Sequence, residues 1–322
     1  MTQLSILQRW YPPQLSKSSF ETYVHFKKVS ENKQHWQEVQ ELTNWKGAHL
    51  LQEYKKPNSK QVTQVHWRLP ATGKTGIFCG IWQYQGCMNY THKKHNGKAF
   101  VRKFKTSCKK SSCPECWYSW VSREAFRSTQ RFENYENVKE KHGFRRPKLI
   151  HVIFSPPWSL KFSRYDEVKK KLREFMAEAG IVGGIAIYHP FGSPKSENPE
   201  EWVVRPHFHV LGYGWLKDTN KIERNGWVIK NKGIRKPHST LSYLLTHCGI
   251  SDKVHSVFWF GELGYRGKYA SEIKVIEDKL EHKLCQFCGF LLHKLEFIGS
   301  IDPPPDSEFE ALLDPKNWKS VA

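Results

Sequence analysis

The stretch from 205 to 215, RPHFHVLGYGW, constrains the fold more than any other because it places two histidines at alternate positions of an apolar run. Alternate residues of a β-strand share a face, so His207 and His209 project side by side while Phe208 points the other way. A single histidine here would be explained as an ordinary core residue. Two on one face favour a metal ion, because imidazole is a common metal ligand.

The residues after 148 follow a succession of strand and helix patterns. Runs rich in β-branched and aromatic residues predict strands at 149–155, 181–189, 207–215 and 255–263. Apolar residues at helical spacing predict helices at 165–180 and 239–249. This order indicates an α+β fold with helices packed on one face of an antiparallel sheet.

Two imidazoles seldom suffice to hold a metal ion, so a third ligand is expected. His189 ends the predicted strand 181–189, and His247 lies on the predicted helix 239–249. His189 is equally well explained as a cap at the end of its strand. We assign His189 to the metal and keep His247 as the alternative.

Five of the eight cysteines lie between 79 and 116, and their spacing predicts a structural zinc site. Cys108, Cys113 and Cys116 lie in a polar stretch of Lys and Ser, where burial of free thiols is not expected, and four thiolates hold Zn²⁺ tetrahedrally. Cys79 or Cys87 would complete the set, and we choose Cys87. Two further cysteines, Cys285 and Cys288, form half of a second zinc site, for which the candidate partners are His282, His293 and Cys248.

The charge balance indicates a polyanionic partner. Lys and Arg number 51 against 31 Asp and Glu, a formal net charge of +20, and 13 Trp, 13 Tyr and 19 Phe are interleaved with them. Such charge favours nucleic acid, whose bases can stack on aromatic rings. The basic run beside the first cysteines is the expected DNA contact: Lys93, Lys94, Arg102, Lys103 and Lys105.

The composition along the chain predicts four regions: an N-terminal region at 1–78, a basic cysteine-rich element with a helix at 79–143, a domain of alternating strands and helices at 144–300, and an acidic mobile tail at 301–322. Residues 36–54 are predicted to form an amphipathic helix. No apolar run has the length of a membrane span, and the first residues lack the apolar core of a signal peptide. We therefore expect a cytoplasmic protein without a membrane partner and with reduced cysteines.

Three segments in order resemble the HUH (His–hydrophobe–His) endonucleases: LIHVIFSPP, RPHFHVLGYG and SYLLTHCGI. That family comprises rolling-circle replication initiators (Rep proteins), relaxases and related transposases. The resemblance covers roughly residues 79–290 and is strongest to initiators of archaeal plasmids and viruses, which pair a GG…HP strand with PHFH and carry cysteine clusters. It implies an HUH/RRM-like palm in which an antiparallel sheet carries the catalytic metal.

The resemblance also implies an activity. Mg²⁺ or Mn²⁺ would sit on the histidines, and imidazole ligation favours Mn²⁺ at least as strongly as Mg²⁺. Tyr243 would attack single-stranded DNA or an origin hairpin, giving a covalent 5′-phosphotyrosine and a free 3′-OH. Many initiators carry Lys three or four residues after this tyrosine, where the present chain has His247, a candidate for metal ligation or proton transfer. Tyr265 and Tyr269 are rival nucleophiles.

Two other functions fit the same residues. One is a transposase with the same chemistry, and the other is a non-catalytic zinc-ribbon protein that binds nucleic acid, in which His207 and His209 are structural. The sequence shows no helicase motor, so an initiator of this kind would need a host helicase and polymerase.

Overall fold

The structure is a computed structural model of the chain, and it describes residues 50–56, 61–192, 202–217, 219–273, 284–300 and 304–321. These residues fall into two compact units. The larger unit contains the described residues of 50–81 and 106–273, and the smaller unit contains those of 82–105 and 284–321. The described part of the smaller unit therefore comes from two segments that are far apart in the sequence.

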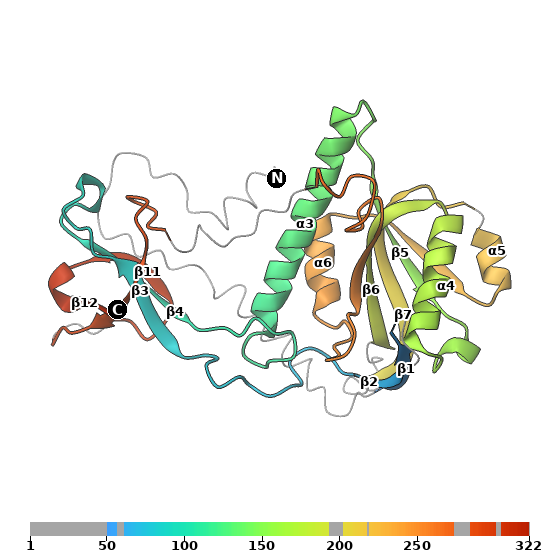
Figure 1. Cartoon of the computed structure of the whole chain (residues 1–322), viewed down its shortest axis with the longest axis horizontal. Helices are drawn as coiled ribbons and strands as arrows, with labels where there is room; N and C mark the ends of the chain where they lie inside the picture. Colours follow the sequence, from blue (N-terminus) through green and yellow to red (C-terminus); the bar gives the residue numbers. More distant parts are fainter. Residues whose placement is uncertain are drawn as a thin grey trace. The chain divides into compact units, whose positions relative to one another are not determined.

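The larger unit is organised around a five-stranded antiparallel sheet with the order β8-β5-β7-β6-β9 (Figure 1). Strands β6 and β7, which lie next to each other, are the longest in this sheet and pair along most of their length. The strands are β5 (Leu149–Ser155), β6 (Ile181–Gly192), β7 (Val203–Gly214), β8 (Val228–Ile234) and β9 (Val257–Gly261).

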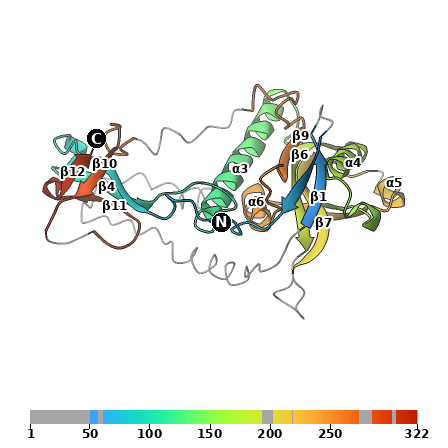
Figure 2. The same cartoon turned by 60° about the horizontal axis from the view of Figure 1, so that its bottom comes forward.

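Elements pack on both faces of this sheet, and each face has its own apolar core. Helices α3 (Trp117–Lys141) and α6 (Pro237–Leu245) cover one face, and α4 (Tyr165–Glu178) covers the other (Figure 1). The hairpin of β1 (Leu50–Lys55) and β2 (Val62–Trp67) packs on the α4 side, and a short α5 (Thr219–Arg224) precedes β8 (Figure 2). Even strand positions such as Phe208 and Val210 enter the α4 core, while Leu211 and Tyr213 enter the α3–α6 core.

Helix α4 shows how local sequence sets these layers. Val168, Leu172, Phe175 and Met176 recur at helical spacing and are buried against the sheet. Asp166 and Glu167 stand in the first turn, where carboxylates favour the helix dipole. Gly180 then adopts a φ of +79°, which lets the chain leave the helix and enter β6.

The smaller unit contains a second five-stranded antiparallel sheet, with the order β11-β4-β3-β10-β12. Its strands are β3 (Trp82–Cys87), β4 (Ala99–Lys105), β10 (His293–Phe297), β11 (Phe309–Leu313) and β12 (Trp318–Val321), with a 3₁₀ turn η1 (Lys93–His95) between β3 and β4. Ala99, Val101, Leu295, Phe309 and Trp318 form a small apolar core.

The α+β class with antiparallel sheets is confirmed, but several expectations are wrong. Helices lie on both faces of the main sheet rather than on one. The region 79–143 is divided between the two units, and the tail predicted to be mobile forms β11 and β12 of a sheet. Residues 50–54 of the predicted helix 36–54 lie in strand β1, and the rest of that helix lies outside the described residues.

Within the described part of the chain, the structure contains no helix long and apolar enough to span a bilayer.

Candidate metal sites

The register of β6 and β7 brings three histidines together on one face of the main sheet. His189 of β6 lies directly opposite His207 of β7, and His209 follows two residues along the same strand. Each offers a ring nitrogen, and these three atoms all lie within 4.8 Å of one another. The ring centroid of His189 is 4.4 Å from that of His209 and 5.2 Å from that of His207. The histidine cluster (His189, His207, His209) could therefore hold a metal ion.

Hydrogen bonds orient two of these rings so that the same nitrogen faces inward. Nδ1 of His207 lies 2.8 Å from the carbonyl oxygen of Arg205, to which it donates as N–H. Nδ1 of His209 lies 2.8 Å from Nε2 of His151, a buried histidine of β5. Both rings thus keep Nε2 for the centre of the cluster, where the two Nε2 atoms are 3.1 Å apart. Partners that fix the outer nitrogen in this way are typical of metal-binding histidines.

His189 is the most informative residue of the cluster because it is fully buried and neither ring nitrogen makes a hydrogen bond of good geometry, although the backbone of Leu244 interacts with the ring. Buried polar atoms in proteins are almost always paired, so an imidazole without a good hydrogen bond needs an explanation. Burial, reinforced by the neighbouring imidazoles of His209 and His247, holds the pKa of His189 well below its usual range. The ring is neutral at pH 7 and carries a lone pair, which is the state that binds a metal.

Tyr243 and His247 stand next to this cluster. Helix α6 begins with Pro237 at its first turn, a position that tolerates the missing N–H, and it carries Tyr243 with 65% of its surface exposed. The His247 ring packs at 4.8 Å from the Tyr243 ring and at 4.5 Å from the His189 ring. Burial lowers the pKa of His247 to about 4, so its imidazole is also neutral at pH 7.

The two rival tyrosines differ in accessibility. Tyr265 is 75% exposed, and its ring lies under the guanidinium of Arg131 at 4.7 Å. Tyr269 is buried, and its ring packs 6.0 Å from that of Tyr135. Of the three candidate nucleophiles, Tyr243 and Tyr265 are therefore exposed and Tyr269 is not.

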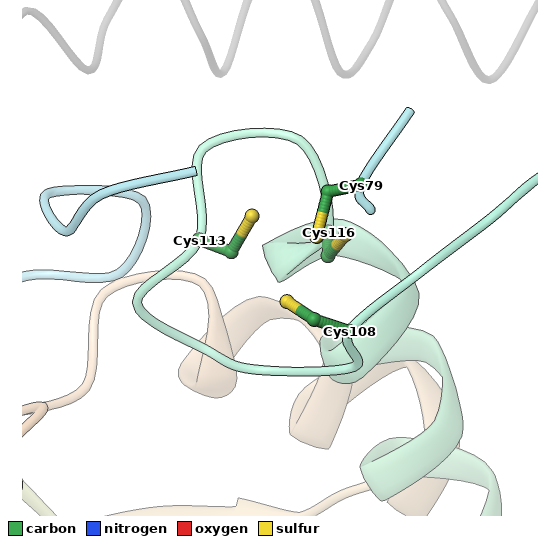
Figure 3. Close-up of side chains that lie close together, drawn as sticks. All are labelled: Cys79, Cys108, Cys113 and Cys116. Carbon is green, nitrogen blue, oxygen red and sulfur yellow. The ribbon is translucent and has the colours of Figure 1, made fainter. Parts of the chain in front are cut away.

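Four cysteines of the larger unit point their sulfur atoms toward a common centre (Figure 3). They are Cys79, Cys108, Cys113 and Cys116, and their Sγ atoms all lie within 4.8 Å of one another. This four-cysteine cluster corrects our choice of Cys87 as the fourth thiolate, because the turn at Gly76–Cys79 brings Cys79 to the other three. The group could hold a metal ion.

The four-cysteine cluster is formed where the chain enters helix α3. The amides of Cys116 and Trp117 both donate to the carbonyl oxygen of Cys113, and Cys116 is the N-cap of the helix. The positive end of a helix dipole favours thiolates at this position. Without a metal, burial and the neighbouring thiols raise the pKa of Cys108 to about 12. Metal binding at this cluster would therefore release protons.

The remaining cysteines predicted to bind zinc form a third group in the smaller unit. Cys285 and Cys288 lie with Cys87 and with His95, a residue that the spacing did not single out. Of the partners proposed from the sequence, His293 is exposed on β10, Cys248 is buried in the larger unit, and His282 lies outside the described residues. In the sequence, the feature that could have indicated His95 as a ligand is its position in a polar segment eight residues after Cys87.

The basic residues expected to contact DNA are not equivalent in the structure. Lys93, Lys94 and Lys105 are exposed. Lys103 is buried: its Nζ donates to the carbonyl oxygen of Pro305 at 2.8 Å and lies 5.0 Å from the Trp82 ring centroid. Arg102 is half-buried and donates to Oε1 of Gln85 at 2.6 Å. Lys103 is thus a structural residue of the smaller unit, which corrects its assignment as a DNA contact.

Comparisons of the chain with protein-family models, with curated proteins and with solved structures gave no match. The fold and the sites define an α+β protein with antiparallel sheets and, among the described residues, three groups of cysteine and histidine side chains that could hold metal ions. Because a fold does not imply a function, the function has to be inferred from these sites.

Proposed function

We propose that the protein nicks and rejoins single-stranded DNA through a covalent phosphotyrosine on Tyr243, with a divalent metal ion on the histidine cluster, and that it initiates rolling-circle replication of a plasmid or virus. The observation that carries this proposal is the fully buried His189, whose ring nitrogens make no hydrogen bond of good geometry, beside His207 and His209 and next to an exposed tyrosine. The HUH resemblance of the three sequence segments supports the same function.

The residues fit the metal that the resemblance implies. His189, His207 and His209 offer three neutral imidazole nitrogens, a donor set that accepts Mn²⁺ and other divalent ions of the first transition row more readily than Mg²⁺. When bound, such an ion would polarise the scissile phosphate and neutralise the charge that develops on its oxygens. The outer hydrogen bonds of His207 and His209 hold the rings in place for this role.

The chain's own residues supply the nucleophile and the proton acceptor. The Oη atom of Tyr243 attacks phosphorus, the bond between phosphorus and the 3′ oxygen breaks, and the departing 3′ oxygen takes up a proton. An unperturbed tyrosine has a pKa near 10, so its proton needs an acceptor during the attack. We assign this role to His247, whose ring packs 4.8 Å from the Tyr243 ring and is neutral at pH 7, although its low pKa makes it a weak base.

The reaction conserves the energy of the phosphodiester bond. A 3′-OH can attack the 5′-phosphotyrosine, restore the DNA strand and return the hydroxyl to Tyr243, so the same residues rejoin what they cut. The net charge of +20 and the exposed lysines suit single-stranded DNA or an origin hairpin as the partner. A host helicase and polymerase would extend the 3′-OH that the nick leaves.

The four-cysteine cluster has a structural role in this proposal. Four thiolates in a closed group are the ligand set of structural Zn²⁺, which takes tetrahedral geometry and leaves no open position for substrate. Zinc bound there would fix the start of α3, the helix that packs beside α6 in the same core. The position of Tyr243 would thus depend on this cluster through the packing of two helices.

Incubation with 5′-labelled and 3′-labelled single-stranded DNA in Mn²⁺, followed by a denaturing gel, tests the proposal. We expect a covalent protein–DNA adduct that disappears in Tyr243→Phe, because this change removes the hydroxyl and keeps the ring. His207→Ala combined with His209→Ala should also abolish the adduct while leaving DNA binding in place. Tyr265→Phe is the matched control, since Tyr265 is at least as exposed as Tyr243.

Two results would refute the proposal. An adduct that persists in Tyr243→Phe, or that peptide mapping places on Tyr265, would show that α6 does not carry the nucleophile. DNA binding without cleavage or adduct in any divalent ion would instead favour a non-catalytic nucleic-acid-binding protein.

A further inference from the structure

The smaller unit contains a compact group of four ligand-type side chains that the nicking reaction does not use. Cys87 ends β3, His95 ends the turn η1, and Cys285 and Cys288 lie in the turn that precedes β10. The Sγ atoms of Cys87 and Cys288 are 3.6 Å apart. Nε2 of His95 lies 3.3 Å from the Sγ atoms of both Cys285 and Cys288.

These separations match a tetrahedral zinc ion. With Zn–S bonds of about 2.3 Å and a Zn–N bond of about 2.05 Å, tetrahedral angles place two sulfurs about 3.8 Å apart and a sulfur and a nitrogen about 3.6 Å apart. The observed distances of 3.6 Å and 3.3 Å lie close to both values. A Cys₃His set is an established ligand set of structural zinc, whereas iron–sulfur clusters usually take four thiolates.

Second-layer hydrogen bonds turn the ligand atoms toward the centre of the group. Nδ1 of His95 lies 3.1 Å from the carbonyl oxygen of Lys98, so it carries the proton and leaves the lone pair on Nε2. The amide of Asn89 donates to the thiol of Cys87, and the amides of Phe287 and Cys288 donate to that of Cys285. Such N–H bonds stabilise the thiolate form that a metal requires.

The backbone around the group is shaped to bring the ligands this close. Gly289, directly after Cys288, has a φ of +74°, which closes the turn so that its amide donates to the carbonyl oxygen of Cys285 at 2.8 Å. Gly86, directly before Cys87, lets β3 approach β4, because a Cβ there would collide with the carbonyl oxygen of Phe100. Phe287 packs its ring on those of His95 and Phe100 and covers the group.

We propose that Cys87, His95, Cys285 and Cys288 bind one structural Zn²⁺, and that this ion holds together the two described segments of the smaller unit. Cys288 is 201 residues from Cys87 and 193 residues from His95 along the chain. The ion therefore ties β3 and η1 to the segment that begins β10. The proposal is independent of the nicking activity, because none of these four residues belongs to the histidine cluster or to α6.

The physical reason for a metal here is the size of the unit. Its described apolar core consists of two small groups, one of five buried residues around Leu295 and one that itself includes Cys87 and Cys285. Cores this small rarely stabilise a domain without a metal, a disulfide or a partner. The ligands become ordered only when the two segments meet, so the free energy of zinc binding becomes free energy of folding of this unit.

Zinc analysis and amide hydrogen exchange of the full-length protein test the proposal. His95→Ala and Cys285→Ser should each hold one zinc fewer per chain than the wild type. In both variants the amides of β3, β4 and β10 should exchange faster, while those of β5, β6 and β7 keep their protection. His95→Cys should retain the zinc, because four thiolates also form a tetrahedral site.

The chain offers two matched controls. His293→Ala removes an exposed histidine of β10 in the same unit, and Cys248→Ala removes a buried cysteine outside the three groups; both variants should hold as much zinc as the wild type. Unchanged zinc in His95→Ala, or a zinc lost in His293→Ala, would overturn the proposal. Both readouts are taken without DNA, so failure of the nicking assay and failure of this assignment are distinguishable.

Discussion

His189 is the residue that best distinguishes a candidate metal site from an ordinary packed core. Its ring is buried and neither nitrogen makes a hydrogen bond of good geometry, while His207 and His209 each engage Nδ1 with a partner and turn Nε2 inward. A sheet face that served packing alone would carry apolar side chains at these positions, as it does at Ile187 and Leu211. Packing alone does not account for this arrangement, and three imidazoles placed in this way could hold a metal ion.

His151 provides the first prediction at this scale. Its Nε2 accepts from Nδ1 of His209, and burial, with Arg235 and Lys232 nearby, lowers the pKa of His151 to about 4, so it stays a neutral acceptor at pH 7. His151→Ala should weaken Mn²⁺ binding by about 10- to 100-fold, as loss of an outer hydrogen bond does at other metal sites. Titration calorimetry with Mn²⁺ in the absence of DNA measures this.

His151→Gln should recover part of the Mn²⁺ affinity, because its amide can again accept from Nδ1 of His209. His255→Ala, at an exposed histidine of the same unit, is the control and should bind Mn²⁺ like the wild type. Equal affinities in all three variants would show that His151 does not position His209.

The cysteines give a second prediction. Seven of the eight belong to the two cysteine groups, and the eighth, Cys248, is fully buried with its pKa raised to about 12 by that burial. A maleimide should modify few thiols in the metal-loaded protein and up to seven after treatment with a chelator at neutral pH. Intact-mass and peptide analysis should find Cys248 unmodified in both cases, because its thiolate is scarce and inaccessible. Modification of all seven thiols before chelation would contradict metal binding at both groups.

At the scale of elements, the two long strands of the main sheet, β6 and β7, meet at a pair of glycines. Gly184 of β6 pairs with Gly212 of β7, and a Cβ on Gly184 would collide with the carbonyl oxygen of Leu211 and lie 2.6 Å from the Cα of Gly212. The same pairing continues without a shift to His189 and His207. The register that places the two glycines opposite each other therefore also places the two histidines opposite each other.

Gly184→Val should therefore lower the free energy of unfolding by about 3 kcal/mol or more, because backbone atoms cannot move aside as a flexible side chain can. Urea denaturation followed by far-UV circular dichroism measures the change. Val182→Ala on the same strand is the control: Val182 is 48% exposed, and surface changes usually shift stability by no more than about 0.5 kcal/mol. A stable Gly184→Val protein would show that β6 and β7 can pair further apart.

Periodicity predicted the elements of the larger unit well and those of the smaller unit poorly. The strand 149–155 and the helix 165–180 match β5 and α4, because apolar residues of both, such as Val152 and Leu172, pack in one core. The basic run expected to contact DNA includes Arg102, Lys103 and Lys105, yet these three residues lie in β4, and Lys103 is buried. The partners of β4, which are β3 and β11, include one from the end of the chain, and such distant pairing leaves no local signal.

The choice between Cys79 and Cys87 failed for the same reason. Both precede Cys108 at distances compatible with one site, so spacing cannot separate them. The structure assigns Cys87 to the smaller unit because Gly86 and Cys87 pair with β4, and it assigns Cys79 to the turn before β3. The histidine cluster was predicted more fully. Alternation within one strand places His207 and His209 on the same face, and only the position of His189 depends on how the neighbouring strand pairs.

At the scale of the whole molecule, the excess of positive charge would attract a DNA partner over a longer range than any other property of the chain. Lys230, Lys232, Arg235 and Lys236 are exposed on and after β8. Two of them lie close enough to the histidine face to act on it, since Lys232 and Arg235 both help to lower the pKa of His151. A phosphate brought to the histidine cluster would therefore be attracted electrostatically by these two charges.

The last prediction tests the proposed binding of single-stranded DNA by this charge. Each phosphate neutralised on a single strand contributes about −0.7 to the slope of log K against log salt, because condensed counterions are released. Lys232→Gln combined with Arg235→Gln should therefore weaken binding of a single-stranded oligonucleotide and make the slope shallower by about 1.4. Fluorescence anisotropy at several salt concentrations measures both quantities, and zinc content should not change.

Two further variants show whether the charges beside the histidine face are the ones that matter. Lys93→Gln combined with Lys94→Gln removes two exposed lysines of the smaller unit and should leave a steeper slope than the Lys232 and Arg235 variant. Lys103→Gln should leave the slope unchanged, because this amine is buried against Pro305 and Trp82, and should instead destabilise the smaller unit. An unchanged slope in the Lys232 and Arg235 variant, with a shallower slope in the Lys93 and Lys94 variant, would place the DNA on the smaller unit.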